Sequence, residues 1–153
     1  MLIYKDSPFF DRQAARAMFE KNKRLMNDHA GFESLFYNSL FFNVYEQGKY
    51  AGIIFVFEEE GKNWIGGAAR RKCHKTCVNA LKEVAGLFDK VYAKTPHKTA
   101  AFCLRRAGFK LIHKNKGMMI FKLKKTKKNS KGGANGKSKE KPQRPRLDER
   151  SVE

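Results

Sequence analysis

Six consecutive residues, 70 to 75, gather cationic side chains where a predicted strand passes into a predicted helix. The first amides of a helix lack acceptors within the helix and bind anions readily. Guanidinium and ammonium groups add charge-assisted hydrogen bonds to phosphate. Without a bound anion, these cations would oppose the dipole of their own helix. The alternative is that they bind no ligand and form a solvated helix start. The pattern therefore predicts a site for a phosphate-bearing ligand, bound by Arg70, Arg71, Lys72, Cys73 and Lys75.

Three kinds of side chain elsewhere in the chain are able to move protons. Glu58, Glu59 and Glu60 end a predicted strand, where a carboxylate is able to accept a proton from an amine. Tyr92 carries a phenol on a later strand, and His97 begins a predicted helix as a general base or as a cap. A solvated turn for the glutamates and core packing for Tyr92 are the structural alternatives. The catalytic candidates are thus Glu58, Tyr92 and His97.

The three cysteines, Cys73, Cys77 and Cys103, are too few and odd in number for a disulfide scaffold. Cys73 and Cys77 lie one helical turn apart, while His74 points about 100° away around the helix. A closed zinc site needs four ligands, so we expect no metal and buried free thiols instead. A nucleophilic Cys73 is a further alternative, since cations flank it, but no base is evident beside it. Free thiols favour a reducing compartment.

Apolar periodicity and turn residues predict the elements that position these groups. Gly108 is predicted as the glycine that ends a helix, and Gly66-Gly67 as a bulge or a close backbone approach. The expected strands cover residues 2–4, 41–46, 50–57, 63–69, 90–94, 109–113 and 118–123, and the expected helices 11–27, 32–40, 72–88 and 97–107.

This order of elements resembles that of the GNAT superfamily, the acyl-CoA-dependent N-acetyltransferases. The resemblance covers residues 1–123 and is concentrated in residues 91–109. It implies an α/β fold with a mixed central sheet flanked by helices, acetyl-CoA as the cofactor and an amine as the acceptor. Many members have Asn, Ala, Tyr and Gly-Phe in this stretch, where the chain has His97, Ala100, Leu104 and Gly108-Phe109.

Two positions depart from the family pattern. The cofactor loop of the family resembles Arg/Gln-x-x-Gly-x-Gly/Ala, whereas this chain has Arg70-x-x-Cys73-x-Lys75 and so lacks both glycines. Leu104 replaces a tyrosine that protonates the leaving thiolate in family enzymes, and leucine has no proton to give. The resemblance thus implies either an active N-acetyltransferase or a catalytically degenerate one.

A closer resemblance is to GNAT-like proteins of tailed phages, which include head-assembly and internal virion proteins. Their third helix is rich in Lys and Arg, and they share the strand, His/Asn, helix and Gly ending found here. This likeness implies the alternative function, a non-catalytic virion or head-assembly protein that uses a basic surface and binds virion proteins.

The formal net charge of +18 over 153 residues favours a polyanionic partner, although solubility alone is the bland alternative. From residue 122 onward there are 12 basic and 4 acidic residues, so the preceding part is basic as well. Residues 124–153 lack aromatic side chains and are predicted to be a disordered Lys/Arg-rich tail after a GNAT-like domain at 1–123. A salt-sensitive nucleic-acid-binding module is the third functional hypothesis.

The first ten residues are too charged for a signal peptide, and no apolar run reaches the ~20 residues of a membrane span. We therefore expect a cytoplasmic protein without membrane contact, located in the host cytoplasm or the virion if a phage encodes it.

Overall fold

The computed structural model describes residues 1–24 and 31–125. Its helices and strands follow the predicted order. They are β1 (Leu2–Tyr4), α1 (Arg12–Asn22), α2 (Phe32–Tyr37), β2 (Ser39–Glu46), β3 (Lys49–Glu59), β4 (Lys62–Ala69), α3 (His74–Ala85), β5 (Lys90–Thr95), α4 (Lys98–Arg106), β6 (Lys110–Asn115) and β7 (Met118–Lys124).

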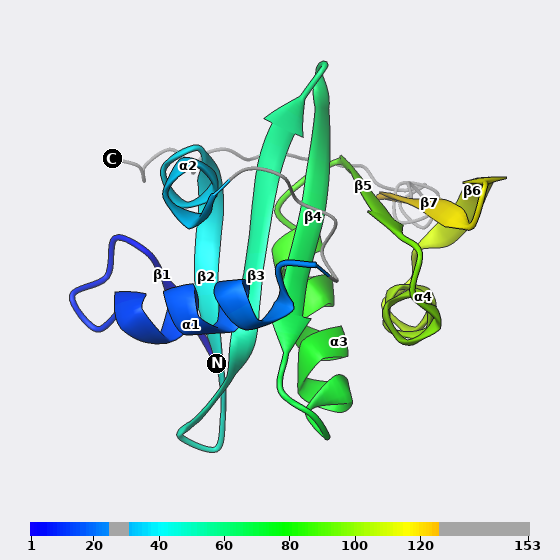
Figure 1. Ribbon diagram of the computed structural model, residues 1–153. Helices are drawn as coiled ribbons and strands as arrows, with labels where there is room; N and C mark the ends of the chain where they lie inside the picture. The colour runs from blue at the N-terminus through cyan, green and yellow to red at the C-terminus, as the bar shows by residue number, and fades with distance from the viewer. Residues whose placement is uncertain (25–30, 126–153) are drawn as a thin grey trace, which may run out of the picture.

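The strands form one seven-stranded sheet in the order β1-β2-β3-β4-β5-β7-β6 (Figure 1). Every neighbouring pair is antiparallel except β4 and β5, which are parallel. On one face α1 packs on β3 and β4, and α2 packs on β2; on the other face α3 packs on β2, β3 and β4, and α4 on β5 and β6. Figure 1 shows α1 in front of the sheet and α3 behind it. The expected mixed sheet flanked by helices is confirmed.

Three hairpins turn through two residues that both have positive φ, as type I′ turns require. Such turns match the twist of the paired strands and fix the register between them. The turn residues are Gln47 and Gly48 (φ 51° and 80°), Glu60 and Gly61 (55° and 76°), and Lys116 and Gly117 (52° and 85°).

Two hydrophobic cores lie on the two faces of the sheet. The core under α3 and α4 is mainly aliphatic and includes Val84, Val91 and Phe121. The core under α1 and α2 is built from phenylalanines, and the ring of Phe41 lies 5.7 Å from that of Phe32 and 5.6 Å from that of Phe55. Each buried aromatic ring removes a large apolar area from water, so this core holds the two short helices on the sheet.

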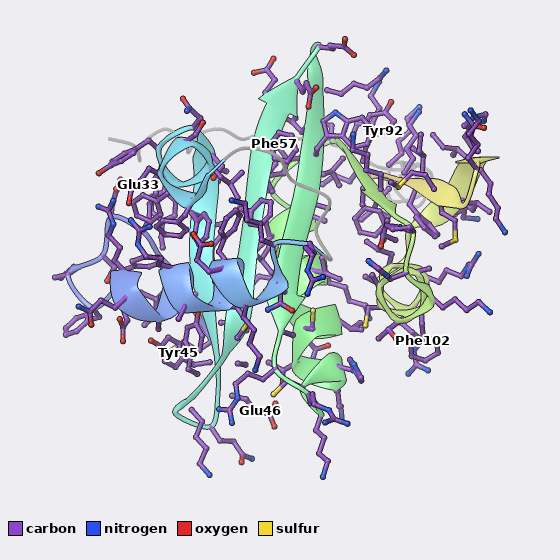
Figure 2. All side chains as sticks on the ribbon, in the orientation of Figure 1. Glu33, Tyr45, Glu46, Phe57, Tyr92 and Phe102 are labelled. Atoms are coloured by element: carbon purple, nitrogen blue, oxygen red, sulfur yellow. The ribbon has the colours of Figure 1, made fainter. Side chains whose placement is uncertain are left out.

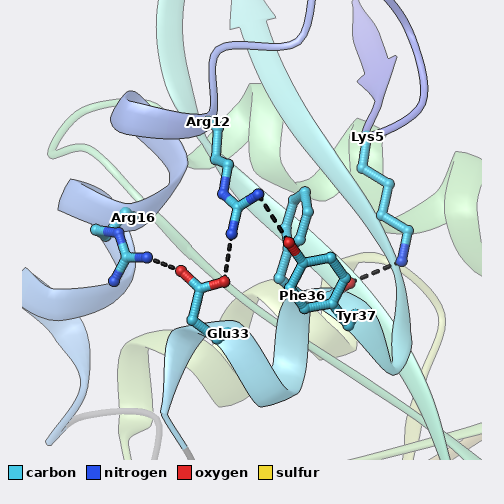
Figure 3. A network of polar contacts seen from close by, with 6 residues as sticks. All are labelled: Lys5, Arg12, Arg16, Glu33, Phe36 and Tyr37. Carbon is cyan, nitrogen blue, oxygen red and sulfur yellow. Dashed lines mark hydrogen bonds and ion pairs between the residues drawn. The ribbon is translucent and has the colours of Figure 1, made fainter.

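An ion-pair network joins α1 to α2 (Figure 3). Arg12 and Arg16 of α1 both pair with the Glu33 carboxylate of α2. Arg12 also donates to the Tyr37 hydroxyl at 3.0 Å. These side chains are nearly half exposed, so the network adds little stability and mainly fixes the mutual orientation of the helices.

The second predicted helix ends earlier than residue 40. The helix stops at Tyr37, and Ser39 and Leu40 already belong to β2. The Lys5 ammonium donates to the carbonyl oxygens of Phe36 and Ser39, at 2.7 Å each. A distant lysine thus satisfies carbonyls at the carboxyl end of the helix, a contact that local sequence does not reveal.

Helix α3 is shorter than the predicted range of 72–88. It begins at His74 and ends at Ala85, so Leu87 falls outside the apolar face and is 63% exposed. Gly108 has a φ of 102° directly after α4, as predicted for a helix-ending glycine. The β3–β4 register runs without a shift past Gly66 and Gly67, so there is no bulge here. Gly67 makes a close approach to the backbone of Ile53, whereas a Cβ at Gly66 would meet the ring of Phe55.

The predicted boundary between domain and tail lies close to the end of β7. That strand ends at Lys124, and the Lys125 amide donates to the Asp89 carbonyl at 2.9 Å. Residues 126–153 of the predicted tail, and residues 25–27 of the first predicted helix, lie outside the described residues. Within the described residues, no helix has the length and apolar character needed to cross a membrane.

Candidate functional site

A divergence of two parallel strands creates the main cleft. In the described chain, β4 and β5 are in register at Trp64 and Tyr92, whose ring centroids lie 5.4 Å apart. Trp64 and Tyr92 are the single β4–β5 pair in the described chain, whereas β5 stays paired with β7 as far as Thr95 opposite Met119, so β4 and β5 separate beyond this point. Backbone groups of both strands therefore face a gap in the middle of the sheet.

The gap is a cleft of about 670 Å³ that passes through the sheet. Small residues of β4 and the end of β5 form its walls, which leaves room between the two strands. Helices α3 and α4 close it on one face, and α2 borders it on the other. Its lining includes Ile65, Gly66, Gly67, Ala68, Ala69, Ala93, Lys94, Thr95, His74, Cys77, Leu81, Thr99, Ala100, Cys103, Leu104, Ser34, Leu35 and Asn38.

The predicted phosphate-binding residues lie at one end of this cleft. Ala69 and His74, which flank the loop, both line the cleft, whereas the loop itself continues outward from it. The side chains of the four predicted cations are exposed, and Cys73 is half-buried. None of the five lines the cleft: Arg70, Arg71, Lys72, Cys73 and Lys75.

The loop is fixed by a few hydrogen bonds. The Cys73 amide donates to the Arg70 carbonyl at 3.2 Å, and the Arg70 guanidinium donates to the Tyr50 carbonyl at 3.1 Å. Lys72 has a φ of 68°, a conformation that L residues adopt at a cost. Arg71 makes no hydrogen bond within the described residues and is free to contact a ligand.

The amino end of α3 is open. Cys73 is its N-cap and makes no capping hydrogen bond through its side chain. The Thr76 hydroxyl instead donates to the Glu46 carboxylate at 2.5 Å. The amides of His74, Lys75 and Thr76 therefore have no acceptor among the described residues, which leaves three donors directed at the end of the cleft.

The structure brings two of the three catalytic candidates to the cleft. Glu58 lines it from the end of β3, as does Glu59, and both side chains are exposed. His97 lines it from the start of α4, and its amide donates to the Thr95 hydroxyl at 3.1 Å. Tyr92 does not line the cleft; its ring packs on that of Trp64.

Two cysteines in the cleft wall were predicted only as buried thiols. Cys77 of α3 and Cys103 of α4 both line the cleft. The interaction of the two thiols, together with burial, raises the pKa of Cys77, and the same interaction lowers the pKa of Cys103. All three cysteines are free. Among residues 1–24 and 31–125, no three His, Cys, Asp or Glu side chains are grouped to hold a metal.

Comparison with known proteins gives structural neighbours but no close relative. No protein-family model matches the sequence, and no curated protein is significantly similar to it. The N-acetyltransferase PseH of Campylobacter jejuni, solved with acetyl coenzyme A, superposes with a TM-score of 0.58 and 13% identity, over 82% of this chain and 100% of that one. This chain has the GNAT fold. The predicted fold is thereby confirmed.

Two further GNAT-fold neighbours agree. A GNAT family acetyltransferase from Elizabethkingia anophelis, with acetyl-CoA bound, gives a TM-score of 0.57 at 9% identity, over 81% of this chain and 97% of that one. A Bacillus subtilis acetyltransferase in complex with CoA gives 0.57 at 10% identity, over 82% and 98%. The likeness to tailed-phage proteins stays a prediction from the sequence.

Proposed function

We propose that this protein binds acetyl-CoA in the cleft between β4 and β5 and transfers the acetyl group to an amine. One observation carries the proposal: the strands diverge after Trp64 and Tyr92, and the resulting cleft ends at the open amino end of α3. The neighbours from C. jejuni and E. anophelis hold acetyl-CoA on the same fold, which supports the choice of ligand.

The residues present fit a phosphate-bearing cofactor even without the family's glycines. Three amides at the start of α3 have no acceptor among the described residues, and no capping side chain blocks them. Arg71, Lys72 and Lys75 are exposed beside them and supply positive charge. In this proposal the side chains of the loop replace part of a backbone cradle, with Cys73 at its centre.

The opposite end of the cleft suits an amine acceptor. Bound acetyl-CoA supplies an activated acetyl group as a thioester. Glu58 and Glu59 place carboxylates at this end, and a carboxylate is able to accept the proton that an amine loses. His97 is the second candidate base. Leu104 lines the cleft and has no proton to donate. We therefore expect acetyl transfer to be slower in this protein than in enzymes that have a tyrosine at this position.

The test is a thermal unfolding series with acetyl-CoA. A ligand that binds only the folded state at 100 times its Kd adds about 2.7 kcal/mol of stability, so the melting temperature should rise. The variant R71Q/K72Q/K75Q should need far more ligand for the same rise. A matched control, K21Q/K82Q/K114Q, removes three exposed lysine charges away from the loop and should behave like the parent. No rise at saturating acetyl-CoA would remove the proposal.

Transfer is tested separately from binding. E58Q should keep the rise in melting temperature and reduce acetylation of an amine panel roughly 10²–10⁴-fold if Glu58 is the base. H97Q should likewise keep the rise in melting temperature and reduce acetylation if His97 is the base. If all three proteins bind acetyl-CoA and none transfers the acetyl group, the protein is a degenerate member that retains the cofactor site.

The division into a GNAT-like domain at 1–123 and a basic tail at 124–153 belongs to this proposal, as does a cytoplasmic location. Nothing in the described residues favours the virion alternative over acetyl transfer.

A further inference from the structure

Within residues 1–24 and 31–125, the part of the sheet formed by β5, β7 and β6 has one face covered by helices and one open face. Val91, Ala93 and Thr95 of β5 are buried toward α3 and α4. Side chains alternate along a strand, so Lys90, Tyr92 and Lys94 point to the opposite face. Helices α1 and α2 pack on β2, β3 and β4 and do not cover this face of β5, β7 and β6. Figure 2 shows Tyr92 at the right of the view, away from both helices.

Lysines dominate this open face. Strand register places Lys122 opposite Tyr92, Lys124 opposite Lys90, and Lys110 opposite Lys122. Lys62 joins them from β4, because it lies two residues before Trp64, the partner of Tyr92. Five of the six are exposed and Lys122 is half-buried. We call this set the lysine face: Lys62, Lys90, Lys94, Lys110, Lys122 and Lys124.

The positive charge of the lysine face is not neutralised within the described residues. The ion pairs there join Arg12 and Arg16 to Glu33, and none involves the lysine face. Glu59 lies opposite Lys62 in register, and Asp89 precedes Lys90, so two acidic residues border six lysines. Like charges held this close repel one another, and a polyanion laid across them removes the repulsion.

Two aromatic rings lie in the middle of the lysine face. Trp64 and Tyr92 are both half-buried, with ring centroids 5.4 Å apart. The ammonium groups of Lys62 and Lys122 lie 5.6 Å and 5.5 Å from the centre of the Tyr92 ring, and that of Lys94 lies 5.3 Å from Trp64. Such contacts are weak at exposed sites, so the lysines are able to leave the rings for phosphates.

We propose that the lysine face, with Trp64 and Tyr92, binds single-stranded nucleic acid. The flexible lysines are able to pair with the phosphates of the backbone, and the two aromatic rings are able to stack on its unpaired bases. A sheet surface uses the same principle when it recognises single-stranded RNA. Duplex DNA keeps its bases stacked inside, where these two rings do not reach them. The site belongs to the folded residues 62–124 and does not rest on acetyl transfer.

The charge contribution is tested with a labelled oligothymidine and the full chain. Fluorescence anisotropy at several salt concentrations gives the slope of log affinity against log salt. The variant K90Q/K110Q/K122Q should lower the magnitude of that slope by roughly 2, since each phosphate contact on a single strand contributes about 0.7. The matched variant K21Q/K49Q/K82Q has the same net charge and the same tail and should keep the slope of the parent. Equal slopes for the two variants would overturn the proposal.

The ring contribution has a built-in reporter, because Trp64 is the single tryptophan of the chain. Oligothymidine should quench Trp64 emission in a saturable way, whereas inorganic polyphosphate, which has no bases, should bind without comparable quenching. Y92L should weaken binding of the oligonucleotide roughly tenfold and leave binding of polyphosphate unchanged. Binding of oligothymidine without a change in Trp64 emission would contradict base stacking.

Two competitors separate the remaining partners. A duplex of equal length should bind more weakly than the single strand at the same salt concentration. Polyglutamate stands for an acidic protein surface and should also bind more weakly. The contradicting result is a polyglutamate affinity equal to that for oligothymidine, reduced to the same extent in the two triple variants. In that case the lysine face is not a nucleic-acid site.

Discussion

Trp64 lies directly opposite Tyr92 in the parallel pair of β4 and β5, and their rings are 5.4 Å apart. This pair marks the point where the two strands stop running side by side. From here the cleft extends toward α3, while the lysine face extends over β5, β7 and β6. One cross-strand contact thus lies at the border of both proposed binding sites.

Gly67 should tolerate no side chain. A Cβ at this position would lie 2.4 Å from the Ile53 carbonyl oxygen, and that atom belongs to the backbone of the neighbouring strand. G67A should therefore lower the free energy of unfolding by about 1–3 kcal/mol, measured by urea denaturation. The control G31A has no atom within 4 Å of its new Cβ, and as the N-cap of α2 it should cost no more than about 1 kcal/mol. Equal effects at both positions would argue against this close approach of β3 and β4.

Lys5 should contribute to stability through its charge rather than through its carbon chain. Its ammonium donates to the carbonyls of Phe36 and Ser39, both at 2.7 Å. K5M keeps most of the stem and removes both donors, so the free energy of unfolding should fall by about 1.5–3 kcal/mol. K49M, at an exposed lysine, serves as the control. A loss no greater than that of K49M would show that the ammonium does not hold α2 to β2.

Cys103 should react with iodoacetamide at a lower pH than a free thiol does. The interaction with the Cys77 thiol lowers the pKa of Cys103, so its thiolate, the reactive form, persists as the pH falls below the usual thiol range. Removing the Cys77 thiol in C77A should shift the rate profile of Cys103 to higher pH, as followed by mass spectrometry. Acetyl-CoA should slow alkylation of Cys103, because this residue lines the cleft. An unchanged profile in C77A would contradict the interaction of the two thiols.

Local sequence signals predict the elements because local physics decides them. Glycines in the turns at 47–48 and 116–117 permit the positive φ values that the hairpins need. Gly108 ends α4 for the same reason. The predicted ends of α2 and α3 were wrong for different reasons. Lys5 contacts the carboxyl end of α2 from 31 residues away, which local sequence does not show. Helix α3 ends locally at Ala85, where Gly86 is the C-cap and its amide donates to the Lys82 carbonyl.

The cleft could be predicted only in part. Gly66 and Gly67 predict a bulge or a close backbone approach, and residues 70–75 predict an anion site. The depth of the gap depends on where β5 leaves β4, and local sequence does not show this because the partners of β5 lie nearly 30 residues away on either side in the chain. For the same reason the thiols of Cys77 and Cys103 were expected to be buried but not to meet, since each lies on a different helix.

The central claim is that acetyl-CoA occupies the cleft between β4 and β5 and contacts the start of α3. Hydrogen–deuterium exchange of the full chain, with and without saturating acetyl-CoA, tests the location directly. Residues 65–78 and 93–104 should exchange more slowly with the ligand, and β1 and the outer part of β2 should be unaffected. Protection confined to other segments, or none at all at saturation, would contradict the account.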